Sequence, residues 1–174
     1  LITAVGPGPV DVFASSGGAL NALALVAVHP DDVATLVAHE PPLVSFLPDA
    51  EQVFAAERAV HAAYQEGGFG AGMAAFIAMT SWTGEFTDAY LARPLPDPAQ
   101  FGLPTEDDGR RDDPLLSATE DETTSFRPDL DALAAAATRV VVGVGVESRD
   151  VLTGRAAAEF AGPGIMISFV ITGV

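Results

Sequence analysis

The segment 10–29, VDVFASSGGALNALALVAVH, restricts the possible fold of this chain more than any other part of the sequence. An apolar run over 10–14 is followed by two serines and two glycines, and then by Ala, Leu and Val at helical spacing. This change of period predicts a strand that turns sharply into a helix around a serine. The arrangement is typical of a nucleophile elbow, in which a tight turn presents a serine hydroxyl.

Ser16 is the predicted centre of this turn. Residues two positions before and after such a serine are expected to crowd together and must therefore be small. Around Ser16 these neighbours are Ala14 and Gly18, whereas a turn centred on Ser15 would place Phe13 in the crowded position. The sequence thus has a GxSxG pattern in which alanine replaces the first glycine.

Gly17 follows this serine and begins the predicted helix. Its backbone N–H is expected at the positive end of the helix dipole, where it can donate to an oxyanion. The alternative is that Ser-Ser-Gly-Gly is only a helix N-cap after a strand, since serine and glycine are favoured there. The agreement of strand, small residues and helix favours the catalytic interpretation.

Charge and composition exclude several classes of function. With 24 acidic and 8 basic residues the net charge is −16, which argues against nucleic acid or anionic membranes as partners. All basic residues are arginines, so a phosphate-binding loop lysine, a Schiff base and a Ser-Lys dyad are excluded. There is no cysteine, and the apolar runs are shorter than the roughly 20 residues of a membrane span. We expect a soluble, cytoplasmic, acidic protein.

Alternating strands and helices predict an α/β fold. The elbow helix ends at His29-Pro30, and a second strand over 34–39 completes a βαβ unit with parallel pairing. Near the other end, the β-branched run 139–146 is typical of a buried central strand, with a helix before it and another helix and strand after it. The prediction is a partial doubly wound parallel sheet.

The region between the two sheet segments has a different character. A helix is expected over 49–66, with Asp49 as N-cap and Gln52 reaching back in a capping box, and Gly67-Gly68 end it. A shorter helix over 73–80 follows, and acidic runs beyond it are interpreted as solvated loop. The predicted organisation is core sheet over 1–42, an inserted helical cap over 43–127 and core sheet again over 128–174.

Acidic residues follow the predicted strand 139–146. In a parallel sheet the carboxyl ends of the strands share one edge, so Glu147 and Asp150 are expected on the same side of the sheet as Ser16. Glu147 directly follows the strand and is the preferred candidate acid, with Asp150 second. The alternative for Glu147 is a helix-start charge without catalytic function.

A histidine base is harder to assign. His29 is expected to end the elbow helix in a structural role, and His61 is expected to be solvated in the cap helix. His39 ends a strand on the same edge as Ser16, but a structural role is favoured there as well. No histidine follows Glu147, and the three histidines show no metal-binding pattern.

Residues 10–42 resemble the nucleophile-elbow region of bacterial α/β-fold hydrolases, and the resemblance continues more loosely through FGLPTEDDGRRDDPLL and RVVVGVGVES to the helix with Arg155. The resemblance implies a Ser-acid-His triad, an acyl-enzyme on an ester, thioester or amide, a small-molecule substrate and no cofactor or metal. By position it makes Ser16 the nucleophile, Gly17 an oxyanion donor and Glu147 the acid.

The sequence departs from this family at both ends. The early strands and the second oxyanion loop have no counterpart before Leu1, and the histidine that the family places after the strand matching 165–169 is missing. We therefore expect a truncated or inactive hydrolase whose uncovered sheet edge lowers its stability. The alternative is a non-catalytic ligand-binding or regulatory module. A nucleotide site at the glycines is disfavoured, because the pattern is not GxGxxG.

Overall fold

A computed structural model gives the fold and describes the whole chain except residues 1, 5, 118–124, 163–167 and 173–174. The described chain forms two compact units. The core unit comprises 1–47 and 126–174, and the helical unit comprises 48–125.

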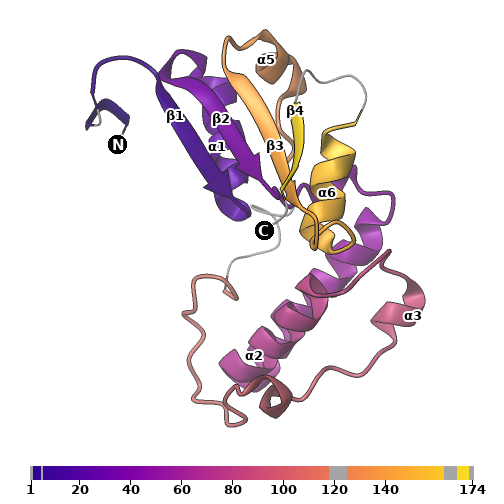
Figure 1. The fold of residues 1–174 in the computed structure, drawn as a ribbon. Coiled ribbons are helices and arrows are strands. Elements are labelled where there is room, and N and C mark those ends of the chain that lie inside the picture. Colours follow the sequence, from indigo (N-terminus) through magenta and orange to yellow (C-terminus); the bar gives the residue numbers. More distant parts are fainter. Residues whose placement is uncertain (1, 5, 118–124, 163–167, 173–174) are drawn as a thin grey trace. The chain divides into compact units, whose positions relative to one another are not determined.

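The core unit is built on a sheet of four parallel strands (Figure 1). In spatial order these are β1 (Val10–Ser15), β2 (Val33–His39), β3 (Arg139–Gly145) and β4 (Ser168–Thr172). Each strand pairs only with its neighbours in this order, and all three pairings are parallel. The predicted parallel sheet is confirmed, and its strand ends share one edge.

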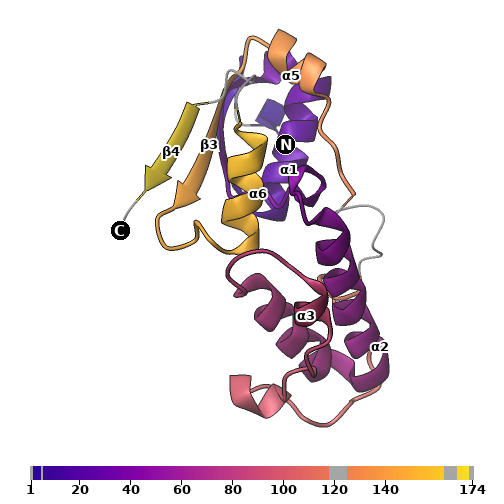
Figure 2. The same cartoon turned by 90° about the vertical axis from the view of Figure 1, so that its right-hand side faces the viewer.

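The helices of the core unit cover one face of this sheet (Figure 2). They are α1 (Gly17–Val28), α5 (Leu130–Ala135) and α6 (Leu152–Phe160), with short 3-10 turns at Ile2–Ala4, Pro30–Asp32 and Val44–Phe46. Alternate strand residues, among them Leu36 and Val142, pack against Leu23 and Phe160 of this layer. On the other face Phe13 is 70% exposed. The expected helical layers of a doubly wound sheet are therefore present on one face only in the described part of the chain.

The helical unit contains α2 (Ala50–Thr80), α3 (Asp88–Leu91) and a 3-10 turn at Pro98–Phe101. Helix α2 is interrupted at Gly68, whose φ of 76° and ψ of −166° leave the helical region, so the predicted break between two helices is confirmed. The predicted capping box is wrong. Asp49 makes no side-chain cap bond to the helix, and its buried carboxylate instead accepts from the backbone N–H of Phe86 at 2.6 Å.

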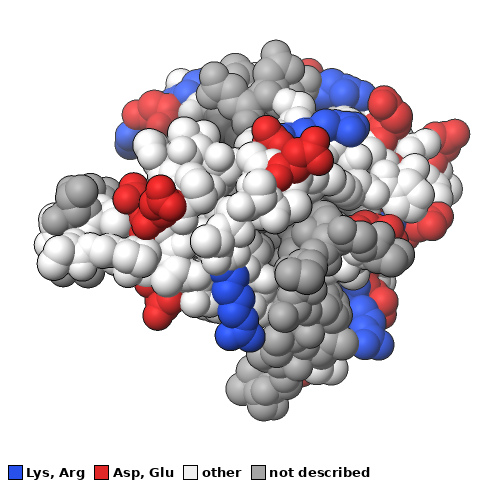
Figure 3. All heavy atoms as spheres, turned by 90° about the horizontal axis from the view of Figure 1, so that it is seen from above, with Lys and Arg blue, Asp and Glu red and all other residues white. Residues whose placement is uncertain are grey.

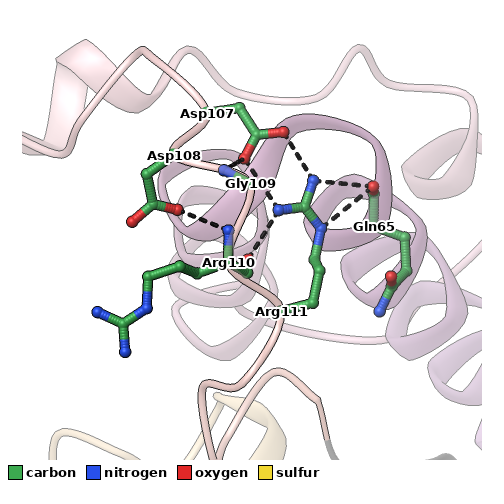
Figure 4. A network of polar contacts seen from close by, with 6 residues as sticks. All are labelled: Gln65, Asp107, Asp108, Gly109, Arg110 and Arg111. Carbon is green, nitrogen blue, oxygen red and sulfur yellow. Dashed lines mark hydrogen bonds and ion pairs between the residues drawn. The ribbon is translucent and has the colours of Figure 1, made fainter.

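Arg111 links α2 to the acidic segment that follows the 3-10 turn Pro98–Phe101 (Figure 4). Its guanidinium donates to both carboxylate oxygens of Asp107, at 2.9 and 2.7 Å, and to the backbone carbonyl of Gln65. The same group lies 5.5 Å from the Tyr64 ring centroid, a cation-π contact. Hydrogen bonding to Arg111 lowers the pKa of Asp107 to about 2. This segment is thus attached to the helix and is not only a solvated loop.

On the face shown in Figure 3, acidic side chains stand in several separate groups with arginines between them. Among the described residues, no helix combines the length and the apolar character that crossing a bilayer requires.

Candidate functional site

Ser16 forms the whole connection between β1 and α1, since the strand ends at Ser15 and the helix begins at Gly17. Its φ is 54° and its ψ is −131°, a region that residues with a Cβ rarely adopt. The turn is held on both sides by backbone bonds. The Ser16 N–H donates to the His39 carbonyl at 2.9 Å, and the Ser16 carbonyl accepts from the N–H of Ala19 at 2.9 Å. The predicted sharp strand-to-helix turn is confirmed, and its serine is exposed.

The structure does not show the steric crowding that was expected to require a small residue at Gly18. A Cβ added at Gly17 or Gly18 would meet no atom within 4 Å, so crowding does not explain the small residue at Gly18. Ala14 packs against the core cluster, which accounts for its size. The backbone angles of Ser16, rather than steric crowding, identify it as the turn residue.

Gly17 is the first residue of α1, whose leading N–H groups have no partner within the helix. Its amide therefore has the place in the fold that an oxyanion donor needs, directly after an exposed serine.

His39 lies beside the elbow. It is the register partner of Ser15 across β1 and β2, and its Nδ1 hydrogen-bonds the Ser15 hydroxyl at 3.1 Å. Its ring stacks on Phe13 with centroids 6.1 Å apart. No hydrogen bond in the described chain joins the Ser16 hydroxyl to a side chain. The histidine nearest to the elbow along the sheet therefore contacts the other serine.

Glu40 is a residue of this edge that the sequence interpretation missed. It follows β2 with a φ of 48°, and its Oε1 accepts from the N–H of Gly145 at 3.0 Å. Its Oε2 accepts from the Thr153 hydroxyl at 3.0 Å, and its Oε1 lies 3.9 Å from Nε2 of His39. Burial raises the pKa of Glu40, but these hydrogen bonds, with one from Ser148, outweigh burial and lower it overall. Glu40 thus links the ends of two strands as a carboxylate.

Glu147 and Asp150 lie in the turn 146–150 after β3, and both are exposed. The N–H of Ser148 donates to the Gly145 carbonyl and shapes this turn. Within the described chain, no hydrogen bond or ion pair holds the Glu147 carboxylate. The strand ends bring Glu147 to the same edge of the sheet as Ser16, but the carboxylate that is bonded there belongs to Glu40.

The other two histidines belong to helices, His29 to the end of α1 and His61 to α2 of the helical unit. His29 ends α1, as expected, and its N–H donates to the Leu25 carbonyl. The expectation that His61 is simply solvated is wrong, because its half-buried ring hydrogen-bonds the Leu116 carbonyl at 3.3 Å. No group of three or more His, Asp or Glu side chains in the described residues is placed to bind a metal ion.

Comparison with known proteins supports the fold. No family model matches the chain, and no curated protein matches it in sequence. Two solved structures from Mycobacterium tuberculosis are similar in fold. Rv0554 matches with a TM-score of 0.61 and 21% identity over 99% of this chain and 60% of its own. BpoC, described as a candidate non-heme bromoperoxidase, matches with a TM-score of 0.56 and 20% identity over 99% of this chain and 61% of its own.

These similarities show that the chain shares its α/β fold with part of these two structures, and they are consistent with the predicted α/β-hydrolase fold. The chain spans about three fifths of the length of each of these two structures.

Proposed function

We propose that this chain carries the nucleophile of a serine hydrolase that acts on a small ester, thioester or amide through an acyl-enzyme. The strained backbone at Ser16, on an exposed turn between a parallel strand and a helix, is the observation that carries this proposal. A residue held in so unfavourable a conformation is common where strain serves a function.

The chemistry follows from the order of the groups. The Ser16 hydroxyl oxygen attacks the acyl carbon, and its proton passes to a base. The oxyanion of the tetrahedral intermediate accepts a hydrogen bond from the Gly17 N–H. The leaving alcohol, thiol or amine departs with a proton, and water then hydrolyses the acyl-serine. By its resemblance to the family, Glu147 is the acid that orients the base.

The base is a histidine in the family that the sequence resembles, and no histidine follows Glu147 in this sequence. Removal of a triad member leaves a residual acceleration of about 10³–10⁴-fold over water, from the oxyanion hole and binding alone. We therefore expect this chain to show weak hydrolysis that external imidazole increases, because imidazole can take the serine proton.

The test is hydrolysis of p-nitrophenyl acetate over a series of imidazole concentrations. Imidazole also reacts directly with this ester, so the rate with Ser16→Ala is subtracted at each concentration. The proposal predicts a Ser16-dependent rate that rises with imidazole and persists in Ser15→Ala. Equal rates for the unmodified chain and Ser16→Ala throughout the series would contradict it.

The second candidate is a ligand-binding module without catalysis. It is favoured by the free Ser16 hydroxyl, which no described side chain contacts as a base. Absence of Ser16-dependent hydrolysis, together with retained binding of a small molecule, would support this alternative.

A further inference from the structure

The helical unit contains a cavity of about 350 Å³, whose lining residues all belong to 48–125. Four alanines line it, Ala56 and Ala59 from the first half of α2 and Ala75 and Ala78 from the second. The segment after α2 contributes aromatic and proline side chains. Because alanine ends at Cβ, the two half-helices leave a hollow where larger residues would fill the space. The volume is in the range of sites for small ligands.

Exposed apolar side chains gather around this cavity. Leu91, Leu95 and Phe101 are 37%, 57% and 39% exposed, and all three line it. They make up three of the seven large apolar residues that are exposed in the described chain. Exposed apolar residues that are scattered singly are ordinary, whereas a group of them around a hollow marks a binding surface.

The aromatic wall of the cavity is held in place. The Trp82 indole N–H donates to the Glu85 carbonyl at 3.2 Å, and its ring lies 5.0 Å from that of Tyr90. Tyr90 in turn makes an edge contact with the buried ring of Phe86 at 4.6 Å. The backbone of Phe86 is bonded to Asp49 at the start of α2. A rigid wall of this kind lowers the cost of ordering side chains when a ligand binds.

The charge of the cavity is opposite to that of the chain. Among the described residues that line the cavity, Arg93 is the only charged one, although acidic residues outnumber basic ones 24 to 8 in the sequence. Its guanidinium lies over Trp82, 4.8 Å from the ring centroid. Arg93 is exposed and makes no ion pair with any acid in the described chain. A guanidinium that is left without a carboxylate in so acidic a chain is available to an external anion.

We propose that this cavity binds a small aromatic carboxylate, with its ring between the alanines and Trp82 and its carboxylate on Arg93. The apolar lining fits the body of such a molecule, and the single cation fits one negative charge. Binding here does not involve Ser16 or any other residue of the proposed hydrolase chemistry, so it stands or fails independently of that proposal.

Trp82 is the only tryptophan in the chain, so its fluorescence reports directly on the cavity. The probe is 4-phenylbutyrate, and the comparison is its neutral amide, 4-phenylbutanamide. We expect saturable fluorescence changes with both compounds and about tenfold tighter binding of the carboxylate, the effect of one charge-assisted hydrogen-bonded pair. The Ser16→Ala variant should bind both compounds as the unmodified chain does.

Two variants and one control complete the test. Arg93→Gln should weaken binding of the carboxylate about tenfold and leave the amide unchanged. Ala78→Phe should fill the cavity and abolish both, with circular dichroism confirming that the fold is kept. The control Arg149→Gln removes the same charge from an exposed turn of the core unit and should change neither. Equal affinity for acid and amide, equal effects of Arg93→Gln and Arg149→Gln, or no saturable change would overturn the proposal.

Discussion

Replacing Ser16 with glycine is expected to stabilise the chain relative to Ser16→Ala, although glycine usually destabilises. Both substitutions remove the hydroxyl, so their difference isolates the backbone. A Cβ-bearing residue at φ 54° and ψ −131° costs about 1–3 kcal/mol, which glycine releases. Glycine also raises the entropy of the unfolded chain, which costs about 0.4–1 kcal/mol. The net expectation is that Ser16→Gly is more stable than Ser16→Ala by about 0.5–2 kcal/mol.

The assay is urea unfolding followed by circular dichroism, with thermal melting as a second measure. In a chain of this size each kcal/mol corresponds to a shift in Tm of about 2–4 °C. The matched control is the neighbouring serine. Ser15 belongs to β1, an ordinary extended strand, so Ser15→Gly should be less stable than Ser15→Ala by about 0.5–1 kcal/mol. Glycine is thus expected to be more stable than alanine at position 16 and less stable than alanine at position 15. If glycine is the less stable substitution at both, Ser16 is not strained and the elbow interpretation fails.

Three further predictions follow from the contacts described above. Gly68→Ala should destabilise the fold by about 2–4 kcal/mol, because alanine is strained at this positive φ and its Cβ would clash with Asp107. The control is Gly102→Ala, which also has a positive φ but lies in open space. It should cost only about 1–2 kcal/mol in the same unfolding assay. Because the pKa of Asp107 is about 2 in the fold against an ordinary 3.8, its stabilising contribution is complete above 3.8 and is lost as the pH falls through about 2. Acid unfolding of Asp107→Asn should lack this step, and a step of equal size would contradict the pairing with Arg111. Gly18→Ala should be neutral or slightly stabilising, since a Cβ there meets no atom, and a loss above about 1 kcal/mol would restore the crowding argument.

Local chemistry made the core of this fold predictable. The change from strand period to helix period around Ser16 predicted the elbow, and the apolar run after Arg139 predicted β3. Asp129 immediately precedes α5 in the sequence and caps it, with its carboxylate accepting from the N–H of Ala132. These features depend on residues that are close in the sequence.

Apart from the local crowding argument for Gly18, the wrong or missing predictions involve residues that are far apart in the sequence. Asp49 has the position of an N-cap, but its carboxylate accepts a hydrogen bond from the backbone N–H of Phe86, 37 residues later. Arg111 binds the Gln65 carbonyl across 46 residues, and Glu40 binds Gly145 across 105. No local pattern reports such bonds, because they form only after the chain has folded. Glu40 directly follows a predicted strand, as Glu147 does, so the same pattern could have identified it as a candidate site residue.

The structure places Ser16 on a strained, exposed turn, with Gly17 starting the next helix. The roles of Gly17 as oxyanion donor and of Glu147 as acid are proposals that rest on their positions and on the family resemblance.

The most direct test of the hydrolase proposal is to treat the chain with a fluorophosphonate in imidazole buffer and map the adduct by mass spectrometry. The account predicts an adduct on Ser16 that forms faster as imidazole increases and is lost in Ser16→Ala. An adduct on Ser15, whose hydroxyl already contacts His39, or no adduct on a folded chain, would contradict it.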